Sequence, residues 1–267
     1  MFLMNRNKAL KLYEMGMSFG RISKETGLNR ATVFRWVKSA GIHEPREINV
    51  YSINHEFFDE INSSDKAYWL GFIFADAYIK KRPSGAKVIR FNLSAKDVHQ
   101  LEKFRVAINY EGPIFSSVKT MKKTGKKHKL VHLSLTNAHM YESLVRHGVL
   151  DYKNRGVQTF QFQMELTQHF LRGLFDGDGM VYIHKPSSQI GVGFCDEHKT
   201  NVKWFQDQII HHLGLFEVKI NYSKSKKCHR FQYRGNTQVR KIFEWLYRSG
   251  PCMERKKSIF SDWFAVN

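Results

Sequence analysis

Two aspartates, Asp76 and Asp178, are the residues whose type and setting could do chemistry together. Each ends a predicted helix, and the helix that ends at Asp76 is apolar nearly all round, which is typical of a buried helix. A carboxylate there faces the negative end of the helix dipole, and two neighbouring carboxylates repel each other. A divalent cation relieves both costs, and Mg²⁺ prefers oxygen ligands of this kind. The alternative is that each aspartate caps a neighbouring turn without a metal.

The two aspartates belong to an internal repeat. The stretch YWLGFIFADA at residues 68–77 returns as FLRGLFDGDG at residues 170–179, a shift of 102 positions. The stretch LDYK at residues 150–153 returns as MERK at residues 253–256, a shift of 103 positions. Because both landmarks keep their spacing, we expect a duplicated domain with a pseudo-two-fold axis rather than a solenoid, for which two repeats are too few.

Small residues line one face of each apolar stretch. Gly71 and Ala75 are four residues apart in the first copy, as are Gly173 and Gly177 in the second. Residues at i and i+4 share a helix face, and small ones let two backbones approach closely. We therefore expect the two helices to pack together, with the two aspartates side by side.

The remainder of each copy predicts an α+β fold in the order helix, hairpin, helix, hairpin, helix. Residues 89–94 alternate between apolar and polar side chains, and the strands around residues 131–135, 190–194 and 230–234 do the same. One face of each antiparallel sheet should be covered by helices. The other face is polar and partly basic, and it meets either DNA phosphates or solvent alone.

The N-terminal residues predict a small all-α domain. Ser18 and Asn29 are candidate helix caps, and Gly27 is a candidate helix stop. Residues 22–33 resemble the helix-turn-helix pattern, in which the last helix enters a major groove. We expect Arg30, Thr32 and Arg35 near bases or phosphates. The alternative is a three-helix bundle that does not contact DNA.

Composition supports a nucleic-acid partner. The chain has 267 residues, with 43 Lys and Arg against 24 Asp and Glu, a formal net charge of +19. An excess of this size opposes compact folding and is typical of proteins that meet phosphate. No apolar run approaches the roughly 20 residues of a membrane span, and no signal peptide is recognisable. Cys195, Cys228 and Cys252 form no C-x-x-C pair, which favours reduced thiols. We expect a cytoplasmic protein without membrane contact.

The repeated motif resembles that of the LAGLIDADG homing endonucleases. Residues 171–179, LRGLFDGDG, fit the motif at nearly every position, whereas the first copy has Phe74 in place of the first acidic residue and Ala77 in place of the terminal glycine. The resemblance covers residues 62–267 and implies a duplicated αββαββα core whose two antiparallel sheets form a saddle. We expect a helix-turn-helix domain over 1–46, a linker over 47–61, and repeats over 62–158 and 159–267.

The resemblance also implies an activity, the hydrolysis of both strands of a long, asymmetric DNA site by a monomeric, intron-homing enzyme. Mg²⁺ would lie between the catalytic aspartates Asp76 and Asp178. Lys153 and Lys256 match a basic position that organises the attacking water, although Arg255 and Lys257 offer other registers and a surface lysine is the simpler interpretation. The saddle residues expected to contact the major groove are Arg90, Asn92, His132, Gln189, Arg230, Gln232 and Arg234.

Two other functions fit the same scaffold. An intron maturase would bind intron RNA in place of DNA or in addition to it. A DNA-binding regulator would use a catalytically inactive core beside its helix-turn-helix, although retention of both aspartates argues against this because an inactive core does not need two adjacent charges.

Overall fold

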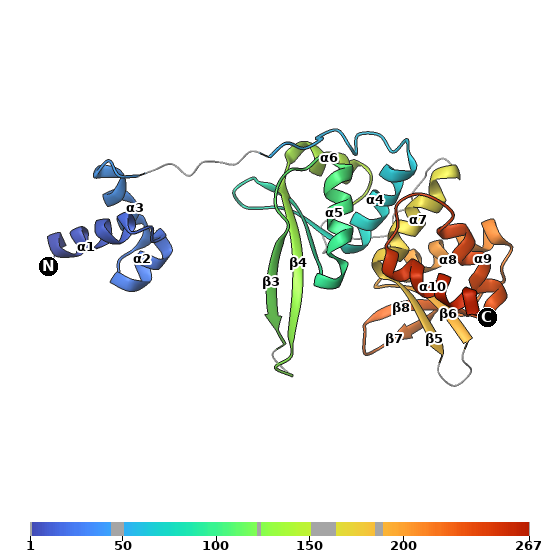
Figure 1. Cartoon of the computed structure of the whole chain (residues 1–267). Helices are drawn as coiled ribbons and strands as arrows, with labels where there is room; N and C mark the ends of the chain where they lie inside the picture. Colours follow the sequence, from blue (N-terminus) through green and yellow to red (C-terminus); the bar gives the residue numbers. More distant parts are fainter. Residues whose placement is uncertain (1, 44–50, 122–123, 151–163, 185–188, 267) are drawn as a thin grey trace. The chain divides into compact units, whose positions relative to one another are not determined.

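The computed structural model describes residues 2–43, 51–121, 124–150, 164–184 and 189–266, and the chain divides into two compact units at Val50 and Tyr51 (Figure 1). The first unit contains helices α1 (Phe2–Glu14), α2 (Phe19–Thr26) and α3 (Arg30–Ser39). Among the described residues, no helix is both long and apolar enough to cross a lipid bilayer.

The helix ends of the first unit lie where the sequence predicts them. The hydroxyl of Ser18 accepts a hydrogen bond from the main-chain N–H of Arg21, and the side chain of Asn29 accepts one from Ala31. Gly27 ends α2 with a φ of 69°, a left-handed conformation that favours glycine. The buried core of this unit consists of Ala9, Ile22, Val33 and Val37.

The second unit repeats one arrangement twice. Its first half contains α4 (Ser64–Asp76), β1 (Ala77–Lys81), β2 (Lys87–Ser94), the 3-10 helix η1 (Ala95–Asp97), α5 (Val98–Ala107), β3 (Phe115–Thr120), β4 (Lys127–Thr136) and α6 (Ala138–Arg146). Its second half contains α7 (Met164–Asp178), β5 (Gly179–His184), β6 (Gln189–Asp196), α8 (Lys199–Leu213), β7 (Asn221–Ser223), β8 (Cys228–Arg234), α9 (Asn236–Leu246) and α10 (Glu254–Val266). The predicted duplicated α+β core is confirmed.

The two sheets have the same topology. Their strand orders are β1-β2-β4-β3 and β5-β6-β8-β7, with all neighbours antiparallel. The residue that follows each motif aspartate pairs with a phenylalanine, Ala77 with Phe91 and Gly179 with Phe194. Both phenylalanines are buried, so the two sheets bury the same face in the same register.

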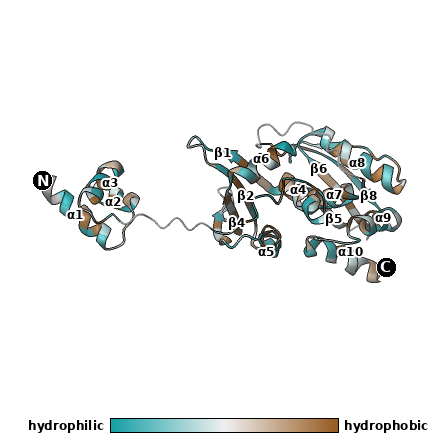
Figure 2. Ribbon diagram, turned by 90° about the horizontal axis from the view of Figure 1, so that it is seen from above, coloured by the Kyte–Doolittle hydropathy of each residue, from teal (hydrophilic) through white to brown (hydrophobic). Residues whose placement is uncertain are grey.

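Helices α4 and α7 lie side by side at the centre of the second unit (Figures 1 and 2). A methyl group built on Gly71 would lie 2.1 Å from the main-chain oxygen of Phe170, and one on Gly173 would lie 2.1 Å from that of Tyr68. No side chain larger than hydrogen fits either position, because the obstacle is main chain. The packing predicted from the small residues is therefore confirmed.

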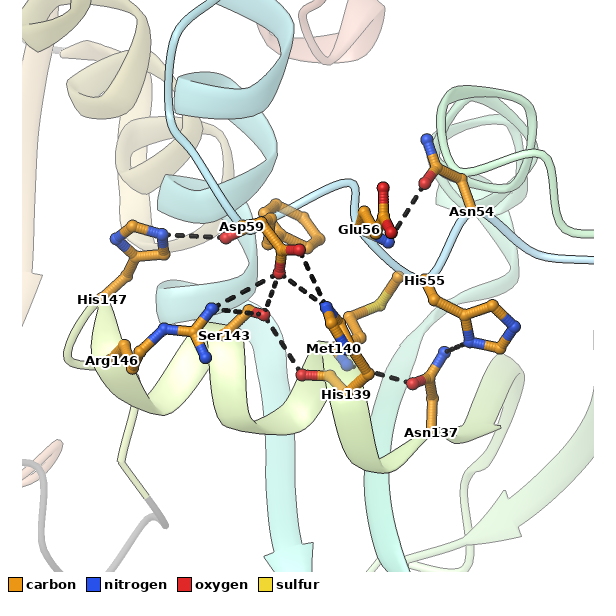
Figure 3. A network of polar contacts seen from close by, with 11 residues as sticks. Asn54, His55, Glu56, Asp59, Asn137, His139, Met140, Ser143, Arg146 and His147 are labelled. Carbon is orange, nitrogen blue, oxygen red and sulfur yellow. Dashed lines mark hydrogen bonds and ion pairs between the residues drawn. The ribbon is translucent and has the colours of Figure 1, made fainter.

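The segment before α4 packs onto the first half, which differs from the linker expected over residues 47–61. Phe57 and Phe58 are buried in the core of the second unit. The carboxylate of Asp59 accepts a hydrogen bond from the hydroxyl of Ser143 at 2.5 Å and lies 2.8 Å from the imidazole of His139 (Figure 3). The hydrogen bond from Ser143 is the main reason that the pKa of Asp59 is lowered, followed by the one with His139. Residues 51–61 therefore belong to the second unit.

Replacing Gly173 with alanine tests the helix contact. The added methyl group would overlap the main-chain oxygen of Tyr68, so we expect the free energy of unfolding to fall by about 3 kcal/mol, the upper end for overpacking. Chemical denaturation measures this loss. The matched control is Gly20→Ala, since a methyl group there meets nothing within 4 Å and removing a helical glycine should stabilise by about 0.5–1 kcal/mol. Equal effects of the two variants would contradict the close contact.

Candidate functional site

The ends of α4 and α7 meet at the candidate site. A methyl group built on Gly177 would lie 2.3 Å from the Cβ of Ala75 and 3.2 Å from Oδ2 of Asp76. The carboxylate of Asp76 thus faces the last turn of α7, beside the residue that precedes Asp178. Both aspartates are half-buried. The packing of α4 against α7 therefore brings the carboxylate of Asp76 to the end of α7, where Asp178 lies.

This donor set fits a magnesium ion. The two side chains would supply carboxylate oxygens, the kind of ligand that this cation prefers. Within the described ranges, no three His, Cys, Asp or Glu side chains are grouped closely enough to hold a metal by themselves. Mg²⁺ is the divalent ion that is usually bound through one or two carboxylates while it keeps several waters.

Lys256 lies beneath the end of α7. Its ammonium group donates hydrogen bonds to the main-chain oxygens of Phe175 at 2.6 Å, Gly177 at 3.3 Å and Gly179 at 2.6 Å. The side chain is almost fully buried, and this burial lowers its pKa, while the charges of Asp176, Asp76 and Asp178 act in the opposite direction. The ammonium group therefore compensates the negative end of the helix dipole.

This placement differs from that of a lysine that faces the substrate. An ammonium group has three protons, and here all three are directed at carbonyl oxygens. Lys256 is therefore placed to hold the end of α7 and, through it, Asp178. Its counterpart Lys153 lies outside the described residues.

A buried polar network surrounds Asp176, which sequence reasoning did not select. Its carboxylate accepts hydrogen bonds from the hydroxyl groups of Tyr68 at 2.8 Å and Tyr247 at 2.5 Å, and from the main-chain N–H of Met253 at 2.6 Å. Burial raises the pKa of Asp176, whereas the hydrogen bond from Tyr247 acts to lower it. Since Tyr68 belongs to α4, the network joins the two halves directly behind the paired helix ends.

Arg172 extends this network on the same helix. Its guanidinium group is buried and donates to the main-chain oxygens of Leu246 at 2.9 Å and Pro251 at 2.7 Å. It also lies 5.3 Å from the centre of the Tyr68 ring. Burial lowers the pKa of Arg172. The loop between α9 and α10, which leads to Lys256, is thereby fixed to α7. The sequence feature that could have indicated this network is the difference between the two copies. The first copy has Phe74 where the second has Asp176, and Leu70 where the second has Arg172.

The sheet residues expected to contact DNA all lie on the face opposite the buried core. On each strand they alternate with buried residues, and the pairing of the strands puts them on one face of each sheet. These residues are Arg90, Asn92, His132, Gln189, Arg230, Gln232 and Arg234. Arg90 donates a hydrogen bond to Asn92 at 3.1 Å, and His132 stacks on Phe115 with ring centres 5.5 Å apart. Partial burial, more than the charge of Arg90, lowers the pKa of His132.

The residues expected to contact DNA in the first unit lie on α3. Arg30 and Arg35 are exposed, and Thr32 is half-buried. Val33 and Val37 are buried on the face that points away from Thr32 and Arg35, whereas Arg30 precedes Val33 by three residues and starts the helix. Two arginines of α3 are therefore exposed, and their contact with DNA stays a prediction.

Comparison with solved structures shows the fold of the chain. A structure of the homing endonuclease I-WcaI, bound to its DNA recognition sequence, superposes with a TM-score of 0.54 at 14% identity, covering 82% of this chain and 96% of that one. The I-LtrWI LAGLIDADG homing endonuclease bound to target DNA gives a TM-score of 0.49 at 12% identity, covering 80% and 90%. The N-terminal LAGLIDADG domain of DUF199/WhiA gives 0.45 at 14% identity, covering 76% and 92%. No family model and no curated protein matches the sequence.

The match to I-WcaI confirms the fold that the repeated motif implies. The chain shares the duplicated α+β fold of that structure, with one helix from each half, α4 and α7, at the centre. Asp76 is the last residue of α4, and Asp178 is the last residue of α7, the equivalent helix of the second half.

Replacing Asp176 tests its structural role. Asp176→Ala leaves two tyrosine hydroxyl groups and one main-chain N–H without their buried acceptor, so we expect the free energy of unfolding to fall by about 3 kcal/mol. Asp176→Asn keeps one acceptor oxygen and should lose about 1 kcal/mol. Urea denaturation measures both, with Asp262→Ala on the exposed surface of α10 as control. A loss for Asp176→Ala no greater than that of the control would rule out the network as a stabilising element.

Proposed function

We propose that the chain is a site-specific endonuclease that hydrolyses both strands of duplex DNA. The observation that carries the proposal is the position of the Asp76 carboxylate against the last turn of α7, next to Asp178. Two acids at adjoining helix ends repel each other, and the packing of α4 against α7 keeps them together. A bound divalent cation and a phosphodiester are the ligands that make this arrangement favourable.

In the proposed reaction, Asp76 and Asp178 hold Mg²⁺ through carboxylate oxygens. When bound, the ion supplies positive charge to the phosphate and lowers the pKa of a coordinated water. The protein residues provide the positions. Lys256 fixes the carbonyl end of α7, and the network around Asp176 prevents the two helices from sliding against each other. The carboxylates are therefore already in place before the substrate binds.

The basic sheet faces are the proposed DNA-binding surface. Their polar side chains project away from the helices, and the chain carries a formal net charge of +19. Positive charge provides affinity for phosphates, while hydrogen bonds to base edges provide specificity. I-WcaI, which has the same fold, is bound to its DNA recognition sequence in its structure. Helix α3 of the first unit is proposed to contact further DNA through Arg30, Thr32 and Arg35.

Asp178→Asn tests the catalytic assignment. The amide is a poorer metal ligand of similar shape, so we expect cleavage of a plasmid library in Mg²⁺ to fall more than about 100-fold while duplex affinity stays nearly unchanged. Adding EDTA to the wild-type protein should abolish cleavage in the same way. Asp262→Asn, on the exposed surface of α10, is the control for the loss of one negative charge.

If duplex affinity falls as far as cleavage, Asp178 is a structural residue. Wild-type protein that binds a duplex without cutting it would indicate a regulator, and binding of intron RNA alone would indicate a maturase.

Arg35→Ala tests the contribution of the first unit. Removing a phosphate-binding side chain from α3 should weaken binding of all duplex sequences similarly and reduce the salt slope of the affinity by about 1. Arg35→Lys keeps the charge and should keep the slope. Affinity measurements at several salt concentrations decide this. An unchanged slope for Arg35→Ala would favour a three-helix bundle that does not touch DNA.

A further inference from the structure

Strand β6 has no side chains at two positions on the side that faces away from the helices. Gly191 and Gly193 alternate with Ile190 and Val192, which are buried on the helix-covered side. Glycine weakens the interior of a strand, so its presence there usually marks a place that something else approaches closely. In this sheet, the approaching groups are side chains from the two neighbouring strands and, at Gly193, also the main-chain oxygen of Phe231, which would lie 2.5 Å from an added methyl group.

The first of these approaches forms a row across three strands. Tyr182 on β5 pairs with Gly191, which in turn pairs with Arg234 on β8. A methyl group built on Gly191 would lie 2.4 Å from Cζ of Tyr182, so the tyrosine ring lies across the glycine. On the far side, Nε of Arg234 donates a hydrogen bond to the hydroxyl oxygen of Tyr182 at 3.2 Å. The glycine thus allows the tyrosine to reach and hold an arginine two strands away.

The next row repeats the arrangement. Met180 pairs with Gly193, which pairs with Gln232. A methyl group on Gly193 would lie 3.4 Å from Cγ of Met180 and 3.1 Å from Cγ of Gln232. The side-chain amide of Gln232 lies 3.5 Å from the sulfur of Met180. In both rows a long side chain from β5 crosses a glycine to contact a polar side chain on β8.

The first sheet does not share this arrangement. By register, the position of Gly193 on β6 corresponds to Arg90 on β2, because Phe194 and Phe91 pair with the equivalent residues Gly179 and Ala77. Arg90 therefore stands on β2 where β6 has a glycine, and it donates a hydrogen bond to Asn92 of the same strand. The two halves therefore present different donor patterns, which suits an asymmetric DNA site.

The orientation of the two β8 side chains suits particular bases. With Nε held by Tyr182, both η nitrogens of Arg234 remain for a bidentate contact with O6 and N7 of guanine. The amide of Gln232 has an oxygen and an N–H for a bidentate contact with N6 and N7 of adenine. Alternate residues of a strand are about 6.7 Å apart, which corresponds to about two base-pair steps of 3.4 Å.

We propose that Arg234 and Gln232, held in place across Gly191 and Gly193, select a guanine and an adenine about two base pairs apart in the half-site bound by the second sheet. The proposal rests on the proposed binding of duplex DNA by the sheet faces. Tyr182 acts as a positioning residue, since it contacts Arg234 rather than the base. The specificity at these two positions is then fixed before DNA binds.

The test is a binding selection from a randomised double-stranded DNA library, carried out with the full chain in EDTA so that no cleavage is needed. Arg234→Ala should reduce the preference for guanine at one position about tenfold or more, and Gln232→Ala should do the same for adenine about two positions away. Tyr182→Phe removes only the hydroxyl group and should weaken the guanine preference without affecting the adenine. Tyr51→Phe, which removes the hydroxyl group of an exposed tyrosine outside both sheets, is the control and should leave both preferences unchanged.

The outcomes separate this proposal from the proposed function. If Arg234→Ala weakens binding of all sequences equally, the residue contacts phosphate and the base assignment is wrong, although duplex binding stands. If Tyr182→Phe leaves the guanine preference intact, the positioning role is wrong. If the wild-type chain retains no duplex from the library, the proposed DNA-binding function itself fails. Circular dichroism of each variant checks that the fold is kept.

Discussion

The contact between the main chains of α4 and α7 is the constraint on which the rest of the second unit depends. At Gly71 and Gly173, each helix touches a main-chain oxygen of the other, at a separation that even one methyl group would prevent. Because each helix leads directly into the first strand of its half, this contact also sets the relation between the two sheets. The same geometry brings Asp76 to the end of α7. Acids that would repel each other are thus held together by packing elsewhere along the helices.

The two helix ends are supported by different means. Beneath α7, the buried ammonium group of Lys256 satisfies carbonyls that a helix end leaves open, and the Asp176 network fixes the neighbouring loop. The first half has an apolar residue, Phe74, at the position of Asp176. The second half therefore holds α7 partly by buried hydrogen bonds to Asp176. The first half contributes Tyr68 as one of the donors of those hydrogen bonds. The duplicated fold is symmetric in its main chain and asymmetric in its interior.

Much of this could be predicted from sequence, because the repeat and the alternation of side chains are local patterns. The helix caps at Ser18 and Asn29, the small-residue helix faces and the two antiparallel sheets follow from such patterns. The surroundings of Asp176 could not be predicted, since its partners Tyr68, Tyr247 and Met253 come from three separate elements. Likewise, the sequence marks Lys256 as a repeated position but not the direction of its ammonium group. The two glycines of β6 are visible in the sequence, whereas the tyrosine lying across one of them emerges only from the register.

The hydrogen bond between Tyr68 and Asp176 has a consequence for which halves can pair with each other. The repeat aligns Tyr68 with Phe170 and Asp176 with Phe74, so donor and acceptor each have a phenylalanine as their counterpart. A symmetric assembly of two second halves would bury two acids opposite two phenylalanines, and one of two first halves would leave each Tyr68 hydroxyl with the amide of Gln100 as its partner and no carboxylate. The two halves therefore complement each other at this position, and a hybrid that separated Tyr68 from Asp176 would lose one of the three hydrogen bonds that the carboxylate accepts.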